Sequence, residues 1–373
     1  MAVPLLDLKA QHATIKNDVV AALMDVVEQQ TFILGKSVGE LECKIAGLSH
    51  TKFAVGCANG TDAILLALRA LQVGAGDEVI TTPFTFFATG GAVHNVGARP
   101  VFVDIDPQTF SLSPDAVRAA VTSRTKSVIA VDLFGQMAPI ERIAAAAGGH
   151  PVLEDAAQSI GASRVINGAT VMAGEAAAIG TFSFFPSKNL GGYGDGGMMV
   201  TQDESLYETL MKLRVHGGRT TYYHEIVGFN SRLDTLQAAV LQAKLPHLAA
   251  WSEARRANAA YYDAAFADVS EITTPYVEPA NTSIYNQYTI RADRRDAVQA
   301  HLKAEGIGNA VYYPLPLHLQ PCFAYLGYQQ GQFPESERAS KEVLSLPVYP
   351  ELTAAQRDEV VTTVRTFYGR SAA

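Results

Sequence analysis

Cysteine is scarce in this chain. Of the 373 residues only three are cysteines, Cys43, Cys57 and Cys322, and they lie far apart. An odd number of cysteines without metal-site or redox spacing argues against a secreted disulfide framework and a cysteine zinc site. We expect three inert thiols in a reducing compartment and no bound metal ion.

Long apolar segments are also missing. The start, residues 1–7, has no cationic stretch followed by an apolar core, so it does not resemble a signal peptide. Charges or glycines interrupt the apolar stretches before they reach the roughly 18 residues that a membrane helix needs. We therefore expect a cytoplasmic protein that has no membrane partner.

Basic residues are fewer than acidic ones. The chain has 29 Lys and Arg against 37 Asp and Glu, a formal net charge of −8, and the charges are scattered. Such a chain lacks the basic surface that binds nucleic acid. With 48% hydrophobic and 18% charged residues, it has the composition of a soluble globular protein.

Strand and helix patterns alternate in the first part of the chain. Near-continuous apolar runs predict strands at residues 78–81, 100–103, 127–131 and 151–154, with helices at 61–71, 113–120 and 139–147. This alternation predicts a mostly parallel sheet with both faces covered. Later patterns predict one long helix over 233–266, a strand at 287–291, and helices at 296–305 and 354–367. We divide the chain into a large domain, residues 1–248, and a small domain, residues 249–373.

Candidate ligand groups follow the predicted strands, where open α/β sheets bind their ligands. Asn59, Gly60 and Thr61 open a predicted helix, whose free amides and dipole can bind a phosphate. A simple helix cap explains the same residues. Asp155 ends an apolar strand and can pair with a protonated pyridine nitrogen. An acid that caps a helix is the ordinary alternative.

Lys188 stands between an aromatic segment and the glycine-rich residues 191–197. Partial desolvation there would lower its pKa and make the amine a nucleophile for a Schiff base. The nearby Ser183 offers a hydroxyl to a phosphate. An exposed lysine in a flexible loop is the alternative. The glycines are no dinucleotide fingerprint, because no strand, turn and helix with suitable spacing accompany them.

Taken together, these segments resemble the DegT-type sugar aminotransferases, fold type I enzymes that use pyridoxal 5'-phosphate (PLP). The resemblance rests on Asn-Gly-Thr-Asp from residue 59, Glu-Asp-Ala-Ala-Gln-Ser from 154, Ser-Phe-Phe-Pro-Ser-Lys-Asn-Leu-Gly from 183 and Gly-Asp-Gly-Gly from 194. Agreement at 214–217, 228–234 and 313–318 extends it over nearly the whole chain. It implies an α/β fold: a large domain with a mostly parallel mixed sheet, and a smaller C-terminal α/β domain.

The resemblance also implies roles for single residues. Lys188 would carry the cofactor covalently, and Asp155 would bind its ring nitrogen; both would be catalytic. The other cofactor contacts that it implies are Gly60, Thr61 and Ser183 at the phosphate, Phe84 and Gln158 at the ring, and Asn230. In such enzymes Asn230 would reach the phosphate of the neighbouring subunit, which implies a homodimer with shared active sites. Expected substrate contacts are Arg232, Tyr313 and His318.

The implied reaction transfers an amine from L-glutamate to a nucleotide sugar. Lys188 favours transamination, since a histidine replaces it in the deoxygenating branch of the family. Segments 230–237 and 283–291 are most similar to enzymes that aminate C3, especially of UDP-2-acetamido-3-oxo-glucuronate, in surface polysaccharide or amino-sugar biosynthesis. Arg232 is the candidate contact for the uronate carboxylate. The alternatives are C3 amination of a dTDP-3-oxo-6-deoxyhexose, amination at C4, and a regulatory or inactive protein.

Overall fold

The computed structural model describes residues 2–371, and its largest sheet has seven strands in the order β1-β9-β8-β5-β4-β2-β3. Only β9 runs against the other strands of this sheet. The strands are β1 (Phe53–Cys57), β2 (Glu78–Thr81), β3 (Arg99–Phe102), β4 (Thr125–Val131), β5 (Val152–Asp155), β8 (Ile179–Ser183) and β9 (Gly197–Thr201). The predicted mostly parallel sheet is confirmed, and each predicted strand lies within two residues of an observed one.

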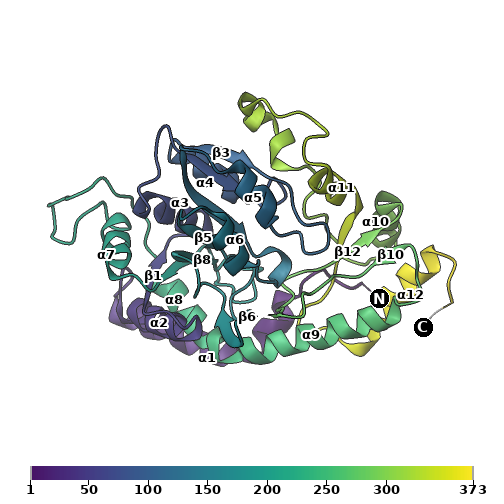
Figure 1. Ribbon diagram of the computed structural model, residues 1–373. Coiled ribbons are helices and arrows are strands. Elements are labelled where there is room, and N and C mark those ends of the chain that lie inside the picture. The colour runs from purple at the N-terminus through teal and green to yellow at the C-terminus, as the bar shows by residue number, and fades with distance from the viewer. Residues whose placement is uncertain (1, 372–373) are drawn as a thin grey trace.

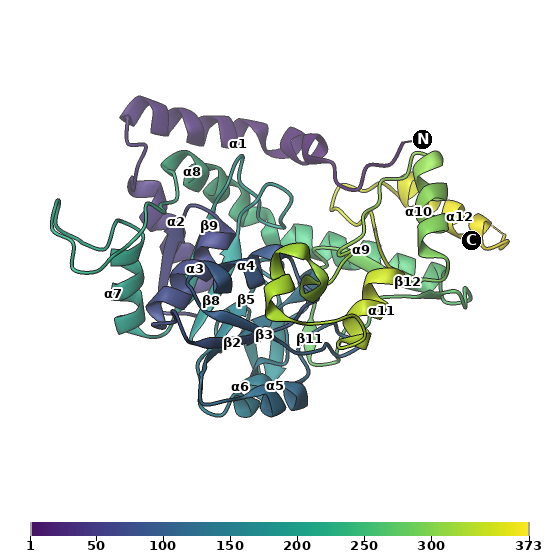
Figure 2. The same ribbon diagram turned by 90° about the horizontal axis from the view of Figure 1, so that it is seen from above.

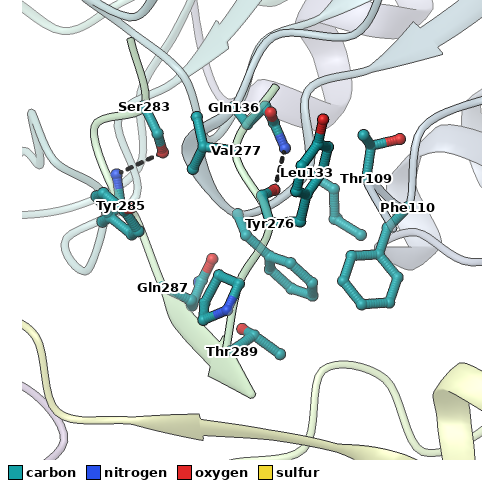
Figure 3. Close-up of a pocket in the computed structure, with 12 residues that line it drawn as sticks. Thr109, Phe110, Leu133, Gln136, Tyr276, Val277, Ser283, Tyr285, Gln287 and Thr289 are labelled. Atoms are coloured by element: carbon teal, nitrogen blue, oxygen red, sulfur yellow. Dashed lines mark hydrogen bonds between the residues drawn. The ribbon is translucent and has the colours of Figure 1, made fainter. Parts of the chain in front are cut away.

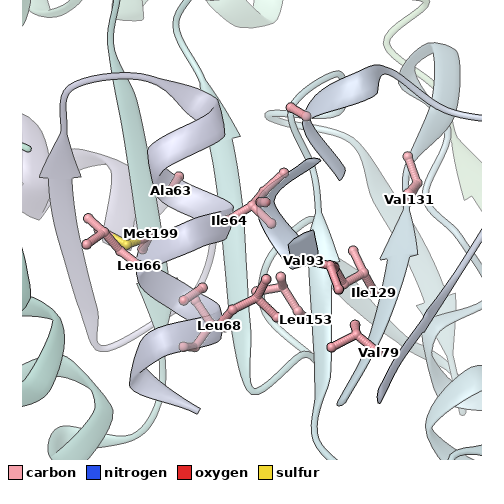
Figure 4. Close-up of a cluster of buried hydrophobic side chains, with 14 of the residues drawn as sticks. Ala63, Ile64, Leu66, Leu68, Val79, Val93, Ile129, Val131, Leu153 and Met199 are labelled. Atoms are coloured by element: carbon pink, nitrogen blue, oxygen red, sulfur yellow. The ribbon is translucent and has the colours of Figure 1, made fainter. Parts of the chain in front are cut away.

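Helices cover both faces of this sheet (Figure 1). One face packs against α3 (Gly60–Ala70), α4 (Phe87–Asn95) and α7 (Glu204–Leu213), and Figure 4 shows the apolar side chains of α3 against those of the strands. The other face packs against α2 (Lys36–Leu48), α5 (Pro114–Ala120), α6 (Ile140–Ala146) and α8 (Thr235–Lys244). Ile129 belongs to the first core and Val128 to the second, because successive side chains of a strand point to opposite faces.

The predicted helix over 233–266 is wrong as a single helix. The structure has α8, a 3₁₀ turn η2 (Leu245–His247) and then α9 (Leu248–Ala265). Pro246 lies in the turn, and proline removes an amide donor and crowds the preceding turn of an α-helix. The long helix α1 (Leu8–Gln29), which the sequence patterns did not predict, packs along α8 (Figure 2).

A second unit follows α9. Its antiparallel sheet consists of β10 (Ile272–Thr273), β12 (Tyr288–Ala292) and β13 (Val343–Leu346), and it shares a core with α9, α10 (Arg295–Ala304) and α12 (Ala354–Phe367). Val3, which the predicted division assigns to the large domain, packs into the same core. The domain division at residue 248 therefore stays a prediction. The remaining elements are β6 (Ser163–Ile166), β7 (Ala169–Met172), β11 (Asn281–Thr282), η1 (Leu133–Gly135), η3 (Leu317–Leu319), η4 (Pro321–Leu326) and α11 (Pro334–Glu342).

The predicted helices at 61–71, 113–120, 139–147, 296–305 and 354–367 and the strand at 287–291 are confirmed, each within one residue. Within residues 2–371, no helix combines the length and the apolar character that crossing a bilayer requires.

Candidate functional site

A cavity of about 460 Å³ opens at the carboxyl ends of the central strands. Its wall includes Val131 at the end of β4, Asp155 at the end of β5 and Ser183 at the end of β8. The N-terminus of α3 lies beside them. Seven of the predicted site residues line this cavity: Gly60, Thr61, Asp155, Gln158, Ser183, Lys188 and Tyr313. The volume lies within the roughly 300–1,000 Å³ that is typical of small-molecule sites.

The start of α3 forms a cradle for an anion. Asn59 caps the helix, because its side chain accepts a hydrogen bond of 2.8 Å from the amide of Asp62. A Cβ atom on Gly60 would lie 2.6 Å from the Cβ of Ser183, so only glycine permits this approach of helix and strand. The early amides of α3 and the Ser183 hydroxyl therefore face one small region, where the helix dipole favours negative charge.

Asp155 is a buried carboxylate at the end of β5. It is 5% exposed, accepts a hydrogen bond of 2.7 Å from the hydroxyl of Thr89, and accepts one of 3.3 Å from the amide of Ala157. Burial raises its pKa, while the Thr89 hydrogen bond and the charge of Lys188 oppose that rise. A carboxylate held this way is stabilised by a cationic partner in the cavity.

Lys188 is half-buried in a turn after β8, where its amide donates to the carbonyl of Phe185 at 2.8 Å. Burial lowers the pKa of its ammonium from 10.5 to about 8, against the opposing effect of Asp155. A substantial fraction of the amine is therefore neutral in mildly alkaline solution. The prediction of a partly desolvated, nucleophilic lysine is consistent with this environment.

Gln158 and Tyr313 form one hydrogen-bonded wall of the cavity. The side-chain amide of Gln158 donates to the Tyr313 hydroxyl at 3.2 Å, and its oxygen accepts from the amide of Phe134 at 2.7 Å. Both ends of the Gln158 amide are thus fixed. Burial raises the pKa of Tyr313, so its hydroxyl stays neutral and can donate a hydrogen bond.

Phe84 and Phe86 differ in their exposure to the cavity. Phe84, expected against a cofactor ring, is fully buried and packs against Phe110 and Tyr313 at centroid distances of 5.6 and 6.2 Å. The cavity wall instead includes Phe86, which is 57% exposed. Phe86 is therefore the better candidate for stacking on a planar ligand, and Phe84 supports the wall from the core.

Asn230 and Arg232 lie outside the cavity of their own chain. Asn230 is exposed, and Arg232 lines a separate open hollow of about 920 Å³ formed with residues 215–228. This segment projects from the body of the molecule beyond α7 (Figures 1 and 2). Two of its side chains, those of Tyr222 and Val227, are 90% and 82% exposed. Apolar side chains so exposed are typical of a protein contact surface.

His318 also lies outside the cavity. It is 2% exposed, and its Nε2 is 3.1 Å from a carboxylate oxygen of Glu337. Burial lowers the pKa of the His318 imidazole, while Glu337 opposes this effect. In this arrangement the imidazole joins η3 to α11 and does not face the cavity.

The cavity residues Phe86, Gln287 and Tyr312 were missed from the sequence, and so was Thr89, the buried partner of Asp155. Phe86 and Tyr312 lie next to motif residues in the sequence, and this was the only sign by which they could have been found. Gln287 also lines a neighbouring pocket, shown in Figure 3 with Tyr276 and Phe110. That pocket holds only about 20 Å³, room for about one water molecule, so it is no ligand site by itself.

The groups in the large cavity fit PLP. A phosphate suits the cradle that the bare Gly60 backbone leaves beside Ser183. A protonated ring nitrogen suits the buried Asp155, and an aldehyde suits the amine of Lys188, whose pKa burial lowers to about 8.

Comparison with known sequences agrees with this fit. Residues 13–365 match the DegT/DnrJ/EryC1/StrS aminotransferase family. A protein of Geobacillus stearothermophilus named "Pleiotropic regulatory protein" is 52% identical over 374 residues, 99% of either chain. A UDP-N-acetyl-3-dehydro-alpha-D-glucosamine 3-aminotransferase of Acidithiobacillus ferrooxidans is 45% identical over 371 residues, again 99% of either chain. A UDP-2-acetamido-2-deoxy-3-oxo-D-glucuronate aminotransferase of Pseudomonas aeruginosa is 45% identical over 359 residues, 95% of this chain and 97% of the relative.

Solved structures agree as well. DesV of S. venezuelae, crystallised with a ketimine intermediate, is 39% identical with a TM-score of 0.95, and 99% of either chain is covered. NtdA of Bacillus subtilis, with the bound cofactor PMP, is 29% identical with a TM-score of 0.91, covering 99% of this chain and 86% of NtdA. The fold is that of the α/β fold type I aminotransferases. The chain belongs to the DegT/DnrJ/EryC1/StrS aminotransferase family, whose enzymes are PLP-dependent.

Proposed function

We propose that this chain transfers the amino group of L-glutamate to a keto group of a nucleotide-linked sugar, with PLP as cofactor. One observation carries the proposal: an amine with a pKa of about 8 and a buried carboxylate share one cavity. Within the described residues, Lys188 is the only lysine that lines it. When bound, PLP supplies an aldehyde that bonds reversibly to amines and a ring that withdraws electrons from the attached carbon.

Each residue of the cavity then has one task. Asp155 keeps a proton on the ring nitrogen through a charge-assisted hydrogen bond. Gly60, Thr61 and Ser183 hold the phosphate, and Phe86 covers the ring. Lys188 removes a proton from Cα of the amino donor and later returns one at the sugar carbon that receives the amine. A pKa of about 8 suits this work, since a general base is most effective near the working pH.

We infer that the enzyme is a homodimer with shared active sites. The projecting segment 215–228 exposes Tyr222 and Val227, and the exposed Asn230 follows it. In a dimer this segment would bury these two side chains against the partner and carry Asn230 toward the phosphate site there. The proposal therefore assigns Asn230 and Arg232 to the cavity of the neighbouring subunit.

For the substrate we propose a UDP-linked 2-acetamido-3-oxo-hexuronate, aminated at C3 for surface polysaccharide or amino-sugar biosynthesis. Two relatives at 45% identity act, by their names, on C3 of UDP-linked 2-acetamido sugars. Within residues 2–371, the charged residues that line the cavity are Asp132, Asp155, Lys188 and Asp195. None is an arginine, so a substrate carboxylate needs a cation from outside, and Arg232 offers a fork for it. The relative from Acidithiobacillus ferrooxidans favours a second candidate substrate, the neutral UDP-linked 3-oxo-glucosamine derivative.

A regulatory protein is the rival reading, because one relative at 52% identity carries that name. A net charge of −8 does not favour binding to nucleic acid. A regulator also has no need of a lysine amine with a lowered pKa beside a buried carboxylate. The cavity therefore supports an enzyme.

The test is amine transfer from L-glutamate to three keto sugars: the UDP-linked 3-oxo-uronate, its neutral 3-oxo-glucosamine counterpart and a dTDP-3-oxo-6-deoxyhexose. We expect the wild type to aminate the uronate best. Arg232→Ala should reduce kcat/KM about tenfold to a hundredfold on the uronate alone, the loss expected for a hydrogen bond to a charged group. Arg118→Ala, at an exposed arginine of α5, is the matched control.

Equal loss on the charged and neutral sugars would remove the support for a uronate. No transfer to any keto sugar by protein loaded with PLP would contradict the proposed function itself.

A further inference from the structure

A second lysine, outside the cavity, contacts the loop that carries Lys188. Lys244 is the last residue of α8 and is only 2% exposed. Its ammonium donates a hydrogen bond of 2.7 Å to the carbonyl oxygen of Gly191, three residues after Lys188. The same ammonium lies 4.8 Å from the centre of the Tyr193 ring, within reach of a cation–π interaction.

The loop folds back on itself and onto α8. The amide of Gly192 donates to the carbonyl of Phe184 at 2.8 Å, and a Cβ atom on Gly191 would clash with the carbonyl of Pro186. The amide of Tyr193 donates to the side-chain oxygen of Gln237 at 2.8 Å. Gln237 and Lys244 are seven residues apart and so lie on one face of α8. This face therefore holds the loop at two successive points.

An ammonium is a costly group to bury at this place. Burial lowers the pKa of Lys244 to about 8, and Glu351 opposes this effect. Both carboxylate oxygens of Glu351 are buried without a hydrogen-bond partner among the described residues, so Glu351 acts at longer range. An apolar side chain would fill the space without this desolvation. What the ammonium provides is the hydrogen bond to Gly191.

We propose that Lys244 is a positioning residue, which fixes the loop of Lys188 against α8 by holding the carbonyl group of Gly191. The task of Lys188 in this proposal rests on the proposed function, but the contact itself needs no cofactor. Asn189 holds the loop at a further point, because its side chain donates to the carbonyl of Ile284 at 3.0 Å. Without Lys244 the backbone after Lys188 loses one of its anchors, and the amine no longer stays at one place in the cavity.

The test combines amide hydrogen exchange with kinetics on the purified protein. We expect Lys244→Met to speed exchange in peptides covering residues 184–193 about tenfold to a hundredfold, as loss of one hydrogen bond to a charged donor allows. Exchange in α3 should not change. The variant should lower kcat and leave KM for glutamate within about twofold. Lys244→Arg should restore most of both, and Lys303→Met, at an exposed lysine of α10, is the matched control.

Exchange that rises equally in all peptides, or a lower melting temperature with unchanged loop exchange and kcat, would mean that Lys244 only stabilises the fold and would overturn the proposal. If Lys244→Met does not fold, Lys244→Leu, which also lacks a donor, is judged by the same outcomes. Faster loop exchange in a protein whose wild type transfers no amine would support the positioning contact and contradict the proposed function. Unchanged loop exchange in Lys244→Met, when the wild type transfers the amine, would support the proposed function and contradict the positioning contact.

Discussion

Asp155→Asn isolates the charge of Asp155 from its shape. Asparagine keeps an oxygen that can accept the hydrogen bond from Thr89, which is 2.7 Å long in the structure. Burial lowers the pKa of Lys188 to about 8, and the negative charge of Asp155 opposes this fall. The substitution removes that charge. Removing it should lower the Lys188 pKa further, because a carboxylate favours the ammonium form. We expect a fall of about 1 unit, the low end of the shifts that opposite charges produce. At pH 7 the neutral fraction of the amine should then rise from about one tenth to about one half.

The assay is the acylation of Lys188 in cofactor-free protein as a function of pH, followed by peptide mass spectrometry. The midpoint for Asp155→Asn should lie below that of the wild type, and Asp115→Asn, at an exposed acid of α5, should leave it unchanged. An unchanged or higher midpoint would refute the electrostatic reasoning. In protein loaded with PLP, turnover should fall about a hundredfold or more, because a neutral amide cannot keep the ring nitrogen protonated through a charge-assisted bond. Near-normal turnover would show that Asp155 only caps the strand.

Two further predictions separate groups that act on ligands from groups that hold the fold. Lys188→Ala should still bind PLP, seen as an absorbance band of the free aldehyde, but its turnover should fall by about 10³-fold or more; turnover within tenfold of the wild type would contradict the role of Lys188. Phe86→Ala should weaken PLP binding with little loss of stability, whereas Phe84→Ala should lower the free energy of unfolding by about 3–5 kcal/mol, measured by denaturant titration. Weaker PLP binding in Phe84→Ala and a lower free energy of unfolding in Phe86→Ala would mean that Phe84 contacts the ring.

Much of the site follows from local sequence rules. Apolar runs ended by polar residues located the strands, and the carboxyl ends of parallel strands meet at one edge of a sheet. Asp155, at the end of the predicted strand 151–154, was therefore expected at that edge, whereas β8, which ends at Ser183, was not among the predicted strands. Asn59 is a good cap at any helix start, and the structure has it in that position. These features depend on a few neighbouring residues, which is why a single sequence suffices to find them.

Other features depend on turns and on distant contacts. Phe84 and Phe86 are similar in the sequence, and the turn around them decides which ring enters the core; there the amide of Phe84 donates to the hydroxyl of Thr82 at 3.0 Å. Thr89 becomes a partner of Asp155, 66 residues further along the chain, only when the fold brings α4 to the end of β5. Pro246 indicates a break between α8 and α9, but the helical pattern on both sides of it led to the prediction of one helix. The role proposed for Arg232 depends on a second subunit, which no local pattern describes.

Borohydride reduction of the purified protein after loading with PLP tests the central claim most directly. Reduction fixes the cofactor to the amine that carries it, and peptide mapping then identifies the residue. We expect one pyridoxyl group per chain, on Lys188, and none on the Lys188→Ala variant. A label on another lysine such as Lys244, or no label in protein that has bound PLP, would contradict the assignment of Lys188 and with it the mechanism proposed for this cavity.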